Sequence, residues 1–101
     1  MTYLDDVAET VRACVPDGVE IPDDADDLFR LYAVLVRAKG VNVTDEDVHD
    51  AWVAWMTSRG EQHDAMVPFG ELGRDVRAQD APFADAIRTA ARDHRRPPTD
   101  T

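Results

Sequence analysis

The sequence predicts an all-α domain, and three observations lead to this prediction. Apolar residues recur at helical spacing (i, i+3, i+4, i+7) along most of the chain, whereas strand-like alternation is nearly absent. Residues that stop or start helices, such as Pro16, Gly40 and Thr44, separate the periodic segments. The length of 101 residues suits one domain. We expect a small single-domain bundle of about four main helices at residues 3–15, 24–39, 45–58 and 81–95, with one or two short helical turns at 69–79.

The first two helices are predicted from their apolar stripes. The stripe of the first helix is made of Leu4, Val7, Ala8, Val11, Cys14 and Val15. The stripe of the second is made of Leu28, Leu31, Tyr32, Leu35 and Val36. Pro16 follows the first stripe and Gly40 follows the second, and both residue types end helices. Because its stripe is also widened by Phe29 and Val34, we expect the second helix to be central.

The third helix has the best-defined start. Thr44 places a hydroxyl cap directly before a run of three acids, which suits the positive end of a helix dipole. Val43 and Val48 stand at the two positions of a hydrophobic staple. We therefore expect this helix to begin at Asp45.

The last helix and the end of the chain are predicted from proline positions and composition. Asp80 precedes the last helix, and Pro82 falls in its first turn, where proline is tolerated. Residues 96–101 contain two prolines and no large apolar side chain, so we expect them to be a disordered tail. The expected domain is thus residues 1–95.

The charge excludes several classes of partner. The net charge is −10 at pH 7, and thirteen of the 21 acidic residues lie in the first fifty. Such a surface repels phosphate backbones and anionic lipid, so we expect neither a nucleic-acid nor a membrane partner. No stretch approaches the roughly 18 apolar residues of a membrane span, and the N-terminus is acidic where a signal peptide is basic. We expect a cytoplasmic protein.

Residues that could carry out chemistry are few. Cys14 is the only cysteine, which excludes an internal disulfide and a cysteine-based zinc site. The three histidines lack metal-binding spacing, and Ser58, the only serine, has no Gly-x-Ser-x-Gly motif around it. The glycines are scattered singly, so no phosphate loop is present. We expect no enzyme, no metal and no cofactor.

The two tryptophans of the third helix raise a question about its surface. Trp52 and Trp55 cannot share one narrow stripe with all the other apolar residues of this helix. Either both complete a small core, or one faces a partner or a pocket.

A series of residues in the second half of the chain has a familiar order. It consists of Val48-His49-Asp50-Ala51-Trp52, Arg59-Gly60, His63, Met66-Val67-Pro68-Phe69, Glu71-Leu72, Gln79-Asp80, Phe83 and Ile87. This order resembles the ryanodine-receptor repeat domain in its stand-alone bacterial or phage form, over residues 48–92. The loop after Gly60 is shorter than in that family, Phe69 replaces a tyrosine, and Ala81 follows Asp80 where the family has an arginine.

The resemblance implies a non-catalytic module that binds a nucleotide-type small molecule or makes protein contacts. The ligand-binding residues would be His49, Trp52, Trp55, Arg59, His63, Pro68 and Phe69. A tryptophan would stack on a planar ligand while His49, His63 or Arg59 bonds its polar edge. Without a ligand, His49 would instead bond a carbonyl of the 61–67 loop, and Asp80 would cap the last helix.

Two hypotheses about function follow. In the first, the protein is a non-enzymatic small-ligand-binding module; in the alternative, it is an acidic protein-protein interaction module or a small homodimer without a ligand. An unrecognised enzyme and a nucleic-acid mimic remain as further readings. A concave site with Trp52 and His63 on its walls would favour the first hypothesis, and a flat loop with both tryptophans buried would favour the alternative.

Overall fold

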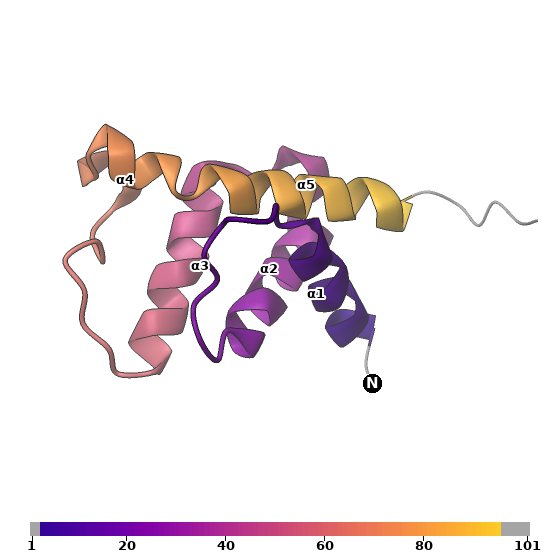
Figure 1. Cartoon of the computed structure of the whole chain (residues 1–101), viewed down its shortest axis with the longest axis horizontal. Coiled ribbons are helices and arrows are strands. Elements are labelled where there is room, and N and C mark those ends of the chain that lie inside the picture. Colours follow the sequence, from indigo (N-terminus) through magenta and orange to yellow (C-terminus); the bar gives the residue numbers. More distant parts are fainter. Residues whose placement is uncertain (1–2, 96–101) are drawn as a thin grey trace, which may run out of the picture.

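The structure is a computed structural model that describes residues 3–95. Within these residues all the regular secondary structure is helical (Figure 1). The elements in order are α1 (Tyr3–Cys14), α2 (Asp26–Ala38), η1 (Gly40–Asn42), α3 (Asp45–Ser58), η2 (Phe69–Glu71), α4 (Arg74–Ala78) and α5 (Ala81–Arg95). The predicted all-α fold with four main helices is confirmed, and the short turns expected at 69–79 are η2 and α4. The tail predicted at residues 96–101 lies outside the described residues.

The boundaries of α2 differ from the prediction at both ends for backbone reasons. Asp24 takes a left-handed conformation with φ of 53°, so the chain turns there and α2 begins two residues later than expected. Gly40 has φ of 58°, a region that glycine enters without a steric penalty, and the chain then makes the 3₁₀ turn η1. This turn was not predicted from the sequence.

The start of α3 agrees with the prediction and is held by a capping box. The Thr44 hydroxyl accepts a hydrogen bond from the Asp47 backbone N–H at 3.1 Å, and the Asp47 carboxylate accepts one from the Thr44 N–H at 2.9 Å. Burial acts to raise the pKa of Asp47, but the hydrogen bonds with Thr44 and the nearby Lys39 ammonium outweigh it and leave that pKa lowered. Asp47 thus replaces the Glu or Gln of the usual capping box.

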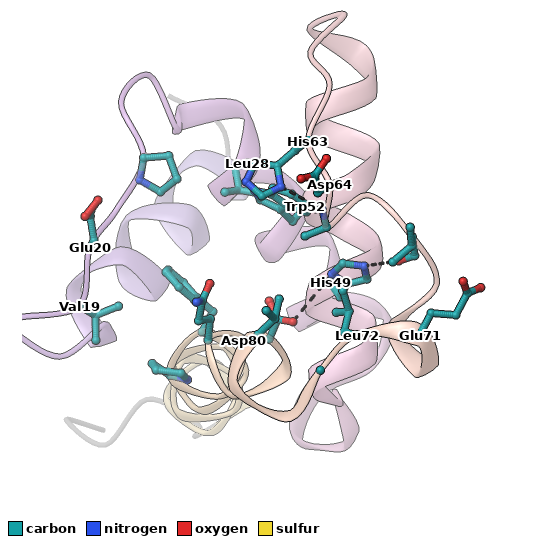
Figure 2. Close-up of a pocket in the computed structure, with 18 of the residues that line it drawn as sticks. Val19, Glu20, Leu28, His49, Trp52, His63, Asp64, Glu71, Leu72 and Asp80 are labelled. Atoms are coloured by element: carbon teal, nitrogen blue, oxygen red, sulfur yellow. Dashed lines mark hydrogen bonds and ion pairs between the residues drawn. The ribbon is translucent and has the colours of Figure 1, made fainter.

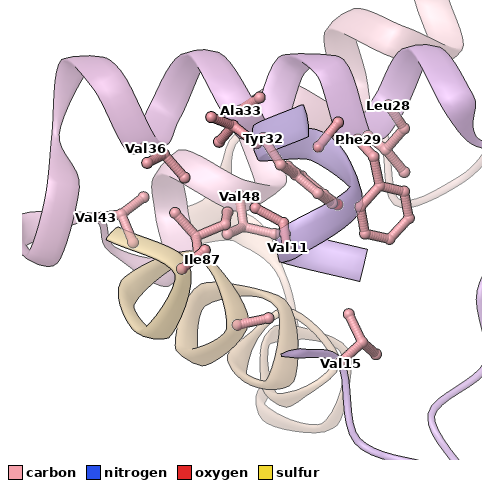
Figure 3. Packing of buried hydrophobic residues seen from close by; sticks show 14 of the residues in the cluster. Val11, Val15, Leu28, Phe29, Tyr32, Ala33, Val36, Val43, Val48 and Ile87 are labelled. Atoms are coloured by element: carbon pink, nitrogen blue, oxygen red, sulfur yellow. The ribbon is translucent and has the colours of Figure 1, made fainter. Parts of the chain in front are cut away.

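The core is formed where α5 crosses the other long helices (Figures 1 and 3). α1 packs against α2 and α5, and α2, α3 and α5 pack on one another. Ile87 of α5 is fully buried among valines of the neighbouring helices. At one end of this core the rings of Phe29 and Tyr32 meet edge to face, 5.3 Å between centroids, and the Phe83 ring lies 5.9 Å from Tyr32.

The segment between α3 and α5 lies outside this core. It leaves the end of α3, loops away from the bundle and returns through η2 and α4 to the start of α5 (Figure 1). Its side chains are mostly exposed or half-buried, and Leu72 is its one buried residue. Several residues of this segment line a cleft between the segment and the bundle.

Candidate functional site

An open cleft of about 980 Å³ lies where α3, the segment after it, the 19–22 loop and the start of α5 meet (Figure 2). Its volume falls within the range of roughly 300–1,000 Å³ that is typical of small-molecule sites. The aromatic and ionisable residues that line it are Glu20, Tyr32, His49, Trp52, His63, Asp64, Glu71, Asp80 and Phe83. The 19–22 loop, α2, α3, the segment after α3 and the start of α5 thus all contribute to one site.

Aromatic side chains make up much of the wall. The half-buried Trp52 ring lies edge to face with His63, 5.3 Å between centroids, and 5.8 Å from the His49 ring. The His63 Nδ1 accepts a hydrogen bond from the Ala65 N–H at 3.0 Å, which orients the imidazole against Trp52. Flat, partly exposed rings of this kind suit a flat apolar ligand.

His49 fixes the loop to α3. Its side chain is buried, and its Nε2 lies 2.6 Å from the Val67 carbonyl oxygen. A carbonyl only accepts, so Nε2 carries a proton and donates it. The expected bond from His49 to the 61–67 loop is therefore present, and this ring nitrogen is committed to holding the loop.

Asp80 turns its carboxyl toward His49 at the floor of the cleft (Figure 2). Its Oδ2 lies 3.9 Å from the His49 Nδ1, which is beyond hydrogen-bond distance, and its side chain is 16% exposed. Burial raises the pKa of Asp80 to about 6; the nearby Asp45 raises it further, while His49 lowers it. The Asp80 backbone carbonyl accepts the first hydrogen bonds of α5, so the residue both starts that helix and presents an acid to the cleft.

The Tyr32 hydroxyl is a second polar group of the cleft that lacks a hydrogen bond to the described residues. Its side chain is 2% exposed, lines the cleft, and its pKa is raised by burial and by the charge of Asp80. Among residues 3–95 its hydroxyl has no hydrogen-bond partner, and no side-chain oxygen there is both sealed from solvent and unpartnered. The hydroxyl therefore opens into the cleft.

The charge of the cleft is one-sided. Glu20, Asp64, Glu71 and Asp80 line it, and no lysine or arginine is among the lining residues of the described chain. A cleft with acidic groups on low-dielectric walls concentrates cations and repels anions.

The residues predicted to bind a ligand are only partly brought together. His49, Trp52 and His63 line the cleft. Trp55 is buried in the core beneath the Arg59 guanidinium, which lies 4.4 Å from its ring centroid, and Arg59 pairs with Glu61.

Pro68 and Phe69 do not line the cleft and lie next to the hydrogen bond between His49 and Val67. Pro68 is exposed at the start of η2, and the Phe69 ring lies 6.0 Å from His49 and 5.3 Å below the Arg77 guanidinium. Phe69 thus supports His49 from the side without lining the cleft.

Sequence reasoning did not select Tyr32 or Asp80 as site residues. The sequence pattern places Tyr32 in the apolar stripe of α2 and indicates a helix cap at Asp80. A hydroxyl on an otherwise apolar stripe was the one available signal for Tyr32, because a buried hydroxyl needs a partner. The structure corrects the interpretation of Asp80 as a side-chain cap: only its backbone carbonyl begins α5, while its carboxyl makes no hydrogen bond with the described residues and faces the cleft.

Two kinds of feature are absent from the described residues. No group of three or more His, Cys, Asp and Glu side chains is arranged to hold a metal ion. None of the helices in residues 3–95 has the length and apolar character needed to cross a membrane.

Comparison with known families overturns the resemblance to the ryanodine-receptor repeat. No family of that type was found, and residues 2–92 instead match the family described as "Domain of unknown function (DUF7701)". The residues that suggested this resemblance mainly cap helices, make apolar contacts or hold a loop in place, and unrelated helical domains also need such residues. No curated protein and no solved structure matches the chain. Because the match covers nearly the whole chain, this protein belongs to the DUF7701 family.

Proposed function

We propose that this protein is a non-enzymatic binding module whose small-molecule ligand occupies the cleft beside α3. The observation that supports this most directly is the concave site of about 980 Å³ with Trp52 and His63 on its walls. A binding surface for a small molecule needs concavity, apolar walls and a few converging polar groups, and this cleft offers all three.

A nucleotide is not the expected ligand, because that expectation depended on the family resemblance, which the family match contradicts. The phosphate of a nucleotide would also face Asp64, Glu71 and Asp80 without a lysine or arginine among the described lining residues. Charge repulsion therefore disfavours phosphorylated ligands.

The interaction-module alternative has less support. That reading expected a flat loop with both tryptophans buried, and Trp55 fits it. Trp52, however, stands half-buried on the cleft wall, with the 59–80 segment arched beside it. The arrangement of α3 and this segment thus favours a ligand over a flat protein contact.

Single-tryptophan variants test the proposal. Trp55→Phe leaves Trp52 as the only tryptophan, so a ligand in the cleft should change its emission and raise the midpoint of thermal unfolding. A ligand present at about 100 times its dissociation constant adds about 2.7 kcal/mol to the folded state, which is a shift of several degrees for a domain of this size. We would screen a fragment set that contains aromatic amines, alcohols, carboxylates, nucleosides and nucleotides.

Trp52→Phe is the matched control, because it leaves only the buried Trp55. Under the proposal, a compound that stabilises the protein leaves the emission of this control unchanged. If no compound shifts both the midpoint and the Trp52 emission, or if the binders report through Trp55 alone, the cleft is not a ligand site.

A further inference from the structure

We infer that the cleft selects a cationic amine attached to a flat ring, with the ammonium seated between Asp80, Tyr32 and His49 and the ring lying against Trp52. This inference depends on the proposed binding function and specifies the chemical class of the ligand. It starts from three polar groups of residues that line the cleft, the Asp80 carboxyl, the His49 Nδ1 and the Tyr32 hydroxyl, which have no hydrogen-bond partner among residues 3–95.

The first step concerns what these three groups lack. The Asp80 carboxylate and the His49 Nδ1 lie 3.9 Å apart, too far for a hydrogen bond, and neither has another hydrogen-bond partner for these atoms among residues 3–95. The Tyr32 hydroxyl likewise has none there. None of these atoms is sealed from solvent, so water or a ligand in the cleft can pair with them.

The second step is the chemistry of that partner. The His49 Nε2 donates to the Val67 carbonyl, and an ionised carboxylate at Asp80 only accepts. The Tyr32 hydroxyl can also accept. The partner must therefore bring several N–H or O–H donors to one point, and an ammonium group, with three N–H donors and no acceptor, meets this requirement.

The third step is the sign of the charge. Four carboxyl groups line the cleft and no described cationic side chain offsets them. An ammonium therefore gains Coulomb energy there, most of it from Asp80, whose surroundings exclude most water. A bare metal ion fits less well, because no three ligating side chains are grouped among the described residues.

The fourth step is the apolar part of the ligand. The apolar or aromatic side chains of Trp52, Phe83 and Leu28 line the same cleft. A ring attached to the amine by a short chain could stack on Trp52 while the ammonium reaches Asp80. The neighbouring aromatic faces also favour a nearby cation.

Three probes that share a ring and differ in charge test the inference: phenethylamine, 2-phenylethanol and 3-phenylpropanoate. We would titrate each into the protein at pH 7.5 and follow the backbone amides of the cleft by NMR. We expect phenethylamine to bind at least tenfold more tightly than the alcohol, and the carboxylate to bind more weakly still. An alcohol or a carboxylate that binds as tightly as the amine would overturn the inference.

Variants locate the selectivity. Asp80→Asn keeps the shape and removes the charge, so the amine should bind it within about threefold of the alcohol. Asp64→Asn is the matched control on the exposed side of the same cleft and should retain most of the preference. Tyr32→Phe keeps the buried ring and should weaken only the amine, by a few fold. An amine preference that survives Asp80→Asn unchanged would overturn the assignment.

Failure of the inference and failure of the proposed function give different results. If all three probes, or adenosine monophosphate, perturb the cleft amides with no preference for the amine, the cleft binds ligands but the assigned class is wrong. If no probe and no fragment perturbs these amides, the binding function itself fails.

Discussion

At the scale of single residues, Asp80 stands out because burial disfavours its ionised form. Its carboxyl is largely buried, lacks a hydrogen bond from the described residues and titrates near pH 6. A group with these properties beside a cleft is more often retained for binding than for stability. His49, its neighbour, has the opposite role, because it ties α3 to the Val67 carbonyl.

We predict that Asp80→Asn stabilises the protein at pH 7. The pKa of Asp80 is raised in the folded state, so between about pH 4 and pH 6 the folded state binds more protons than the unfolded state, and stability falls as the pH rises through this window. With allowance for partial solvent exposure, the variant should gain about 1–2 kcal/mol at pH 7 and little at pH 4. Urea unfolding of both proteins from pH 4 to pH 8 measures this.

The groups that face Asp80 are His49, Asp45 and Tyr32, and all three remain in the variant. The difference between the two stability curves therefore isolates Asp80. A difference that is constant with pH, or that grows toward low pH, would contradict the prediction.

At the scale of elements, the segment between α3 and α5 is attached at few points. The His49 bond to Val67 holds its first half. The buried Leu72 side chain anchors the second half, which is braced internally because the Arg77 guanidinium donates to the carbonyls of Leu72 at 3.0 Å and Gly70 at 2.8 Å. A segment with so few buried contacts opens locally at lower free energy than the core.

We predict that His49→Asn releases this segment while His49→Gln retains it. A glutamine amide reaches about as far as Nε2 and can donate to Val67, whereas the asparagine amide ends near the Nδ1 position. Hydrogen exchange at the amides of Met66, Glu71 and Leu72, which bond within the segment, should speed up about tenfold or more in the asparagine variant.

The glutamine variant is the control for loss of the imidazole ring. If both variants exchange equally fast at these amides, the Nε2 hydrogen bond is not what holds the segment. Exchange at Ala90 in the core reports global unfolding and should be compared in each variant.

At the scale of the whole molecule, α5 unites the domain. It contacts α1, α2, α3 and η1, and the Arg88 guanidinium donates to the Val43 carbonyl at 2.6 Å. The cleft opens at its N-terminal end, where Asp80 and Phe83 meet Tyr32 of α2. The position of α5 thus determines both the core and the floor of the site.

We predict that Ile87→Ala destabilises the protein by about 2–5 kcal/mol, because the Ile87 side chain is fully buried and its loss leaves a cavity in the core. Against a typical stability of about 5–15 kcal/mol for a domain, this should lower the thermal midpoint by ten degrees or more. Val34→Ala, at a position 47% exposed on α2, is the control and should change stability by less than about 0.5 kcal/mol. Similar losses in the two variants would show that α5 does not anchor the core.

Most of the helical architecture could be predicted from the sequence because its signals are local. The Thr44 cap, the acids after it and the valine staple determine where α3 begins, and the structure places that start at Asp45 as expected. The late start of α2 was missed because it depends on the left-handed backbone of Asp24, which no periodicity reveals. The 3₁₀ turn at Gly40 was missed for a similar reason.

The sequence by itself determined an acidic, all-α bundle and the bounds of α3, and it left the bond from His49 to the 61–67 loop as one of two alternatives that the structure then resolved. Only the tertiary structure decided that Tyr32, His49 and Asp80 share one cleft, and that Trp52 faces it while Trp55 lies in the core. These outcomes depend on how α5 and the 59–80 segment pack against α2 and α3. Local patterns determine the helices, but burial and unsatisfied hydrogen bonds arise only when distant segments meet.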